Sequence, residues 1–149
     1  MGVVKFVLRR IKRGDEQSID LLCQKCFPED DAFGIAKSLI EIQHFYVAEE
    51  LETKKILGFI AFGIYSIDTA HIMILAVEPE YQRKGIGTKI MDYSMDIIEK
   101  TPIKRVRLEV KITNIAAIRF YEKLGFETKA TFENYYEDKS NAFVMVKIL

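Results

Sequence analysis

The sequence has only two cysteines in its 149 residues. Two cysteines cannot supply the four ligands of a structural zinc site, and we expect no metal. They form Cys23-x-x-Cys26, in a stretch whose apolar residues recur at helical spacing. A redox pair needs its dithiol at the start of a helix, whereas this pair falls in the last turn. The pattern therefore predicts core packing for both cysteines.

Long apolar runs are also missing. None reaches the roughly 18 residues of a membrane span, and the run from Val3 to Leu8 is too short for the core of a signal peptide. With reduced cysteines and no signal, the sequence predicts a cytoplasmic protein without a membrane partner.

An excess of positive charge is the third absence, because 22 basic residues balance 22 acidic ones. A protein that tracks nucleic-acid phosphates needs a broad basic face, so we expect no direct nucleic-acid partner. The basic cluster from Arg9 to Arg13 is interpreted as the solvated end of a first strand.

The length predicts one domain spanning residues 1–149, large enough to bury about two thirds of its unfolded surface. Alternating and helical apolar spacings define its elements. The predicted strands are 3–11, 45–49, 56–65, 70–77, 105–112, 127–135 and 142–148. The predicted helices are 15–27, a short one from Asp30 or Asp31 to Gln43 or His44, 86–100 and 114–124. This order indicates an α+β fold around a mixed sheet, with 70–77 covered on both faces.

The most informative motif runs from Gln82 to Thr88, between an apolar strand and a helix. Gly85 and Gly87 let the backbone turn with its N–H groups converging, and the helix that follows adds the positive end of its dipole. We expect a pyrophosphate there. The spacing fits neither a Walker loop nor a dinucleotide fingerprint, in which Ile90 would have to be glycine.

This motif, Gln-x-x-Gly-x-Gly after Leu75-Ala76-Val77, resembles the acetyl-coenzyme A signature of the Gcn5-related N-acetyltransferases, the GNAT superfamily. The segment from Asn114 to Phe126 resembles a late helix of that family. Asn134-Tyr135-Tyr136 resembles the final hairpin of its protein N-alpha-acetyltransferase branch. The resemblance implies the GNAT fold, a splayed, mixed and mostly antiparallel sheet flanked by about four helices, and an enzyme that uses acetyl-coenzyme A.

The resemblance also implies the residues that hold the cofactor. The backbone of Leu75, Ala76 and Val77 would bind the pantetheine arm. Asn114 would cap its helix and contact the same arm. The N–H groups of one loop would hold the pyrophosphate: Gln82, Arg83, Lys84, Gly85, Ile86, Gly87 and Thr88.

Two residues would move protons if the resemblance holds. Glu109 lies at a strand position where the branch often has a proton acceptor, twelve positions before Tyr121, which matches the general acid for the sulfur of coenzyme A. From the residues alone, Glu109 also fits a solvated strand face and Tyr121 a helix aromatic that packs on the sheet.

His71 departs from the pattern, because some relatives have a tyrosine there that helps to hold the catalytic water. Histidine is also suited to acid and base work, although a lone histidine at the edge of a strand is more often structural. The base is therefore left open between Glu109 and His71.

On the acceptor side, Phe27, Pro28 and Glu29 resemble the loop beside the first residue of the peptide, and Tyr135 and Tyr136 would face it. We interpret the acceptor as the N-terminal α-amine of proteins or peptides. The alternatives are an enzyme for small-molecule amines and a non-catalytic module that binds acyl-coenzyme A. A monomer or weak homodimer is expected, and an auxiliary subunit stays open.

Overall fold

The computed structural model describes residues 3–28, 34, 37, 44–64 and 66–149. Among these residues, three α-helices and a 3₁₀ helix accompany the strands, and the short helix predicted between Asp30 and His44 lies outside the described residues apart from isolated positions. The strands are β1 (Phe6–Arg10), β2 (His44–Glu50), β3 (Ile56–Ile64), β4 (Thr69–Val77), β5 (Arg105–Lys111), β6 (Glu127–Phe132) and β7 (Ala142–Ile148). The helices are α1 (Glu16–Cys26), η1 (Pro79–Tyr81), α3 (Ile86–Glu99) and α4 (Ile115–Lys123).

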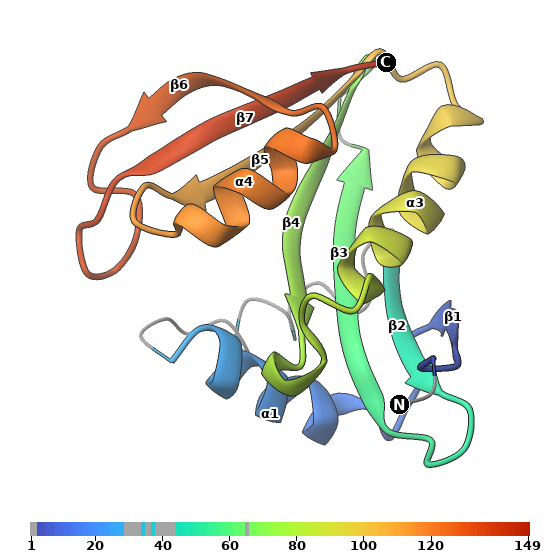
Figure 1. Ribbon diagram of the computed structural model, residues 1–149. Helices are drawn as coiled ribbons and strands as arrows, with labels where there is room; N and C mark the ends of the chain where they lie inside the picture. Colours follow the sequence, from blue (N-terminus) through green and yellow to red (C-terminus); the bar gives the residue numbers. More distant parts are fainter. Residues whose placement is uncertain (1–2, 29–33, 35–36, 38–43, 65) are drawn as a thin grey trace.

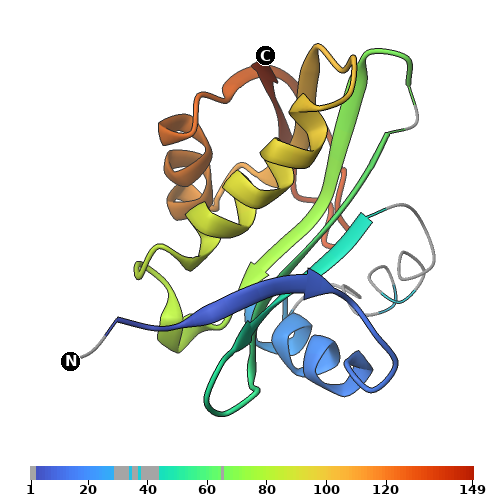
Figure 2. The same ribbon diagram turned by 90° about the vertical axis from the view of Figure 1, so that its right-hand side faces the viewer.

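The strands form one seven-stranded sheet in the order β1-β2-β3-β4-β5-β7-β6. Among the described strands, only β4 and β5 pair in parallel, and the other neighbours are antiparallel. Helix α1 covers one face, while α3 and α4 lie on the other (Figures 1 and 2). The α+β prediction is therefore confirmed, and β2 and β3 form an antiparallel hairpin.

Two apolar clusters hold these layers together. Alternating strand residues on one face, with Ile90 and Ile98 of α3, form the larger cluster. Residues on the opposite face of the strands, with Ile19 and Cys23 of α1, form the second cluster. Burial raises the pKa of Cys23 to about 12, so this thiol is an inert core group, as predicted.

Gly58 of β3 allows a close backbone approach. A Cβ at this position would lie 2.6 Å from the carbonyl oxygen of Ala76 on β4 and 3.1 Å from the Ile90 side chain. Since any other residue would push the strands apart, Gly58 fixes the end of β4 against β3. Next to Gly58, the β2–β3 register shifts between Ala48 and Glu49.

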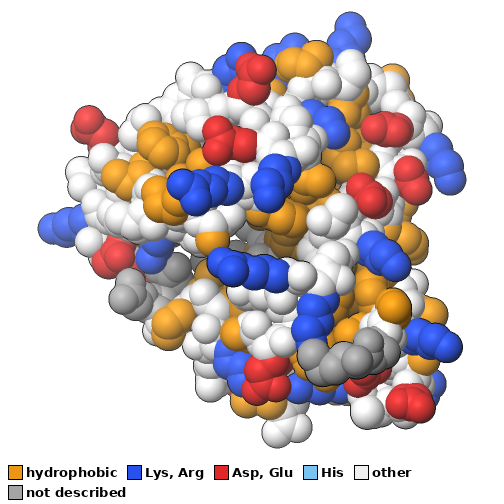
Figure 3. Space-filling view, viewed as in Figure 1, with side chains coloured by type: hydrophobic (Ala, Val, Ile, Leu, Met, Phe, Trp, Pro, Cys, Tyr) orange, Lys and Arg blue, Asp and Glu red, His pale blue; other side chains and the backbone are white. Residues whose placement is uncertain are grey.

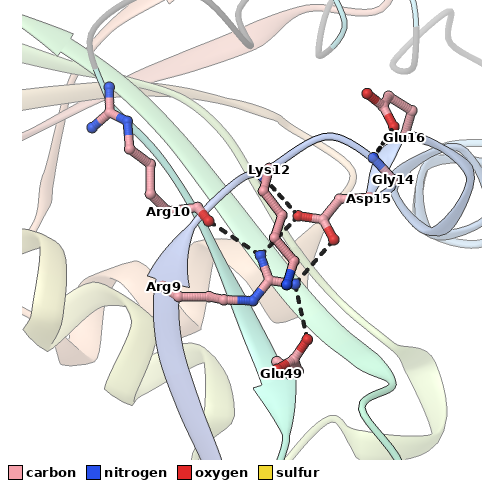
Figure 4. A network of polar contacts seen from close by, with 7 residues as sticks. All are labelled: Arg9, Arg10, Lys12, Gly14, Asp15, Glu16 and Glu49. Atoms are coloured by element: carbon pink, nitrogen blue, oxygen red, sulfur yellow. Dashed lines mark hydrogen bonds and ion pairs between the residues drawn. The ribbon is translucent and has the colours of Figure 1, made fainter.

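The Arg9 to Arg13 cluster is not merely a solvated strand end. Arg9 donates from its two terminal nitrogens to both carboxylate oxygens of Asp15, at 2.8 and 3.0 Å, and to Glu49 at 2.9 Å (Figure 4). Asp15 also accepts from the backbone N–H of Lys12. The Asp15 side chain is only 8% exposed, so its ion pair with Arg9 is largely buried. Through these contacts the network joins β1, the start of α1 and β2. Asp15 precedes α1 without capping it, because its oxygens are used elsewhere.

We expect Asp15→Asn to lower the free energy of unfolding at pH 7 by about 2–3 kcal/mol, because it breaks a largely buried ion pair. Burial acts to raise the pKa of Asp15, but the hydrogen bonds from Arg9 and Lys12 outweigh it and leave that pKa below its usual value. This stabilisation is therefore complete above the unfolded pKa of about 4 and disappears as the pH falls through the lower folded pKa.

Urea unfolding between pH 2 and 7 tests this expectation. The variant should lose less stability than the wild type on acidification. Asp92→Asn, at an exposed position of α3, is the matched control. Parallel pH profiles for the wild type and Asp15→Asn would contradict the assignment.

Candidate active site

The parallel strands β4 and β5 pair through only three residue pairs, from Thr69 with Arg105 to His71 with Arg107. Beyond His71, β4 continues along β3 while β5 continues along β7, so the two strands diverge (Figure 1). A cavity of about 580 Å³ lies in this gap. Its lining residues are Phe27, His71, Ile72, Met73, Ile74, Leu75, Leu108, Glu109, Val110, Lys111, Asn114, Ala117, Tyr121, Tyr135, Tyr136 and Glu137.

The cavity is bounded by elements from both faces of the sheet. Phe27 reaches it from the end of α1, whereas Ala117 and Tyr121 reach it from α4. The sequence predicted that residues 70–77 are covered on both faces, and this is wrong for Met73 and Leu75, which are only half-buried. The gap beside β4 leaves these side chains open to the cavity. Two molecules could meet in such a cavity, one approaching from each face.

A carboxylate and an imidazole are in contact on the cavity wall. Glu109 Oε2 lies 2.6 Å from His71 Nε2, and the two residues are 38 positions apart. The Glu109 side chain is 7% exposed and that of His71 is 23% exposed. Arg107 Nη2 lies 3.5 Å from the other carboxylate oxygen of Glu109. The solvated-face alternative is therefore wrong for Glu109, and the pair is placed to take up a proton in the cavity.

Tyr121 lines the same cavity from α4. It packs edge to face against Phe120 and Phe126, with ring centroids 5.2 and 5.8 Å away. Burial raises the pKa of Tyr121, which keeps the phenol protonated. No described residue accepts a hydrogen bond from its hydroxyl, so that proton is free for a molecule in the cavity.

Local sequence fixes both ends of α4. Asn114 Oδ1 accepts a hydrogen bond from the N–H of Ala117 at 3.2 Å, which confirms the predicted cap. Gly125 has φ of +96°, and the N–H of Phe126 donates to the carbonyl of Tyr121. This glycine stop turns Phe126 back onto the helix and holds the Tyr121 ring.

The expected pyrophosphate loop lies between η1 and α3. Gly85, with φ of +82°, precedes the first turn of α3, and no side chain caps that turn. The N–H groups of Ile86, Gly87 and Thr88 thus open the helix and have no partner within it. Such a turn is suited to bind an anion. On the face in Figure 3, Lys and Arg side chains surround an apolar hollow.

The two glycines of this loop have different structural roles. A Cβ at Gly85 would meet nothing within 4 Å, so glycine is needed there for its backbone angle rather than for space. A Cβ at Gly87 would lie 3.3 Å from the Phe120 ring, so this glycine lets α3 approach α4. Gly87 therefore serves the packing of the two helices, whereas Gly85 serves the turn itself.

Gln82 acts within the protein. Its N–H donates to the Pro79 carbonyl at 3.3 Å, and its side-chain amide donates to the Val77 carbonyl at 3.0 Å. Gln82 thus ties the loop to β4, and the N–H groups open to an anion start after it. Arg83 and Lys84 are exposed, and Lys84 Nζ also lies 5.2 Å from the Tyr81 ring centroid.

Some of the residues predicted to contact the acceptor lie at the cavity, and others do not. Phe27, Tyr135 and Tyr136 line the cavity, Pro28 is exposed and outside the lining, and Glu29 lies outside the described residues. Burial raises the pKa of Tyr135, and the nearby charge of Glu109 raises it further. The hairpin and the Glu109 carboxylate therefore share one electrostatic environment.

Other lining residues were not predicted, among them Met73, Ile74 and Glu137. The sequence did offer some evidence for Met73, because it lies two positions after His71 on β4, and alternate residues of a strand point to the same face. No residue pattern, however, shows where two strands separate. Among the described residues, no group of three acidic, histidine or cysteine side chains is placed to hold a metal ion. The described helices are all too short or too polar to cross a membrane.

Comparison with known proteins adds to this geometry. Residues 17–126 match the model of the acetyltransferase (GNAT) family. The bS18-alanine N-acetyltransferase of Escherichia coli strain K12 is 37% identical over 90 residues, which cover 57% of this chain and 61% of that protein. The matched segment thus spans less than two thirds of this curated relative.

Two solved structures cover nearly the whole chain. Ard1 from Thermoplasma volcanium superposes with a TM-score of 0.90 at 32% identity, covering 98% of this chain and 99% of the other. Naa50 from Arabidopsis thaliana, in complex with the bisubstrate analogue CoA-Ac-MVNAL, superposes with a TM-score of 0.80 at 26% identity, covering 97% and 99%.

Proposed function

We propose, because the chain belongs to the acetyltransferase (GNAT) family, that it transfers an acetyl group from acetyl-coenzyme A to the N-terminal α-amine of proteins or peptides. Residues 1–149 would form one N-acetyltransferase domain. The main support for this proposal is the cavity between β4 and β5. It brings together the Glu109–His71 pair, the Tyr121 hydroxyl, and Tyr135 and Tyr136. Elements from both faces of the sheet line this cavity.

The residues fit acetyl-coenzyme A at two places. Beyond His71, the edge of β4 that faces β5 has no partner strand among the described residues, so Leu75 and its neighbours can pair with the amides of a pantetheine arm. The first turn of α3 offers N–H groups to a pyrophosphate. Bound acetyl-coenzyme A would supply an activated acyl carbon and a thiol leaving group.

The chain's own task is then to move protons. The Glu109–His71 pair would take one proton from the incoming ammonium, directly or through a water, and so free the amine to attack. The Tyr121 hydroxyl would give a proton to the departing sulfur. An N-terminal amine has a pKa near 8, compared with about 10.4 for lysine, so a modest base suffices for a chain terminus.

The walls of the cavity support a peptide acceptor. Phe27 on one side and Tyr135 and Tyr136 on the other line it, and the tyrosine hydroxyls can hydrogen-bond the first peptide groups of an extended chain. The E. coli relative is named a ribosomal protein bS18-alanine N-acetyltransferase, and the Naa50 structure is a complex with the bisubstrate analogue CoA-Ac-MVNAL. We also place the enzyme in the cytoplasm, in keeping with its two free cysteines.

An acetylation assay with labelled acetyl-coenzyme A tests the proposal. Peptides with a free N-terminus, the same peptides blocked at the N-terminus but with an internal lysine, and spermidine are compared at equal concentration. We expect label on the free termini, with kcat/KM at least tenfold above that for internal lysines, because only a terminus offers adjacent peptide groups. A preference for spermidine over every peptide would favour a small-molecule acetyltransferase, and no transfer at all would favour a binding module.

A further inference from the structure

The end of α1 is tied to the end of β4 by an ion pair. Lys25 Nζ lies 2.6 Å from Glu78 Oε1, although the residues are 53 positions apart. The Glu78 side chain is 4% exposed, while that of Lys25 is 46% exposed. Glu78 is itself fixed in the sheet, because its N–H donates to the Leu57 carbonyl on β3 at 2.7 Å. Lys25 therefore reaches from the end of α1 to a buried carboxylate whose backbone is held on β3.

The next residue adds a second tie. Cys26 Sγ donates to the carbonyl oxygen of Val77 at 3.3 Å. That same oxygen accepts the side-chain amide of Gln82, the residue that anchors the proposed pyrophosphate loop. One backbone carbonyl thus connects the last turn of α1 with the start of this loop. We call the Lys25–Glu78 and Cys26–Val77 contacts together the α1 strut.

The α1 strut ends where the acceptor side of the cavity begins. Phe27 directly follows Cys26 and lines the cavity, and its N–H donates to the Cys23 carbonyl at 2.8 Å. The position of Phe27 is therefore set by the last turn of α1. Because the strut holds that turn on Val77 and Glu78, the distance between the acceptor wall and the cofactor strand depends on it.

We propose that Lys25 is a positioning residue, which through the α1 strut holds the acceptor wall at Phe27 in register with the cofactor strand and loop. This inference rests on the proposed peptide acetylation. Lys25 touches neither substrate, and it acts through Glu78 and the last turn of α1. Its loss should impair the use of the peptide and leave the binding of acetyl-coenzyme A intact.

Steady-state kinetics of Lys25→Met tests the proposal, since methionine keeps the apolar stem and removes the charge. We expect KM for an N-terminal peptide to rise about tenfold, while kcat and the affinity for coenzyme A by calorimetry change less than twofold. Lys25→Arg keeps the ion pair and should retain the wild-type KM. Lys129→Met, at an exposed ion pair on β6, is the matched control and should change nothing.

A double variant separates positioning from folding. Lys25→Met leaves the Glu78 carboxylate buried without its ion partner, which can destabilise the protein. Lys25→Met/Glu78→Gln removes both charges and should recover thermal stability, yet keep the raised peptide KM. The inference would be overturned by a wild-type peptide KM in both variants, or by a peptide KM that returns to the wild-type value in the double variant together with its stability. Either result would leave the proposed function standing. If the wild type itself acetylates no peptide, the proposed function fails and the inference with it.

Discussion

Glu109→Gln is expected to lower kcat for peptide acetylation by about 10²- to 10⁴-fold, the scale of positioned acid and base groups. Glutamine keeps the size of the side chain and can still bond to His71, but it cannot accept a proton. The affinity for acetyl-coenzyme A should stay within about threefold, because Glu109 faces the same side of the sheet as α1, away from α3. Initial rates with a free-terminus peptide and calorimetry with coenzyme A measure the two effects.

The matched control is Glu127→Gln, at an exposed carboxylate on β6, which should keep the wild-type kcat. His71→Phe separates the two partners of the pair. If Glu109→Gln keeps full activity and His71→Phe abolishes it, the base is His71, and the carboxylate only orients the ring.

Tyr121→Phe is expected to lower kcat by a similar factor, about 10²- to 10⁴-fold, because it removes one hydroxyl proton from the cavity. The phenylalanine ring keeps the edge-to-face contacts with Phe120 and Phe126, so the fold should be preserved. Since burial raises the pKa of Tyr121, the wild-type phenol stays protonated throughout the neutral range and should produce no ionisation of its own in the pH profile of kcat there.

Rates of the variant with acetyl-coenzyme A, and with a thioester whose thiol is more acidic, measure this role. A better leaving group needs less help from an acid, so the deficit of Tyr121→Phe should shrink with it. Tyr93→Phe, which changes a tyrosine packed against Tyr46 away from the cavity, serves as the control. An equal deficit with both thioesters would show that Tyr121 positions the substrate instead of donating a proton.

The sequence determined the features that depend on neighbouring residues. Alternating and helical spacings located the strands and helices of the described residues to within a few residues, because each element buries one face of its own. Asn114 and Gly125 fixed the ends of α4 through local hydrogen bonds and one backbone angle. Gly85 likewise marked the turn into α3. The α+β fold followed from this order of elements together with the family resemblance.

Only the tertiary structure decided which distant residues share an environment. His71 and Glu109 meet at 2.6 Å because β4 and β5 run in parallel just far enough to bring them together, and the cavity opens where that pairing ends. Arg9 with Asp15, and Lys25 with Glu78, are likewise partners that charge alone could not select. Where two strands separate depends on how the helices pack on both faces of the sheet, and that balance of long-range contacts leaves no local pattern in the chain.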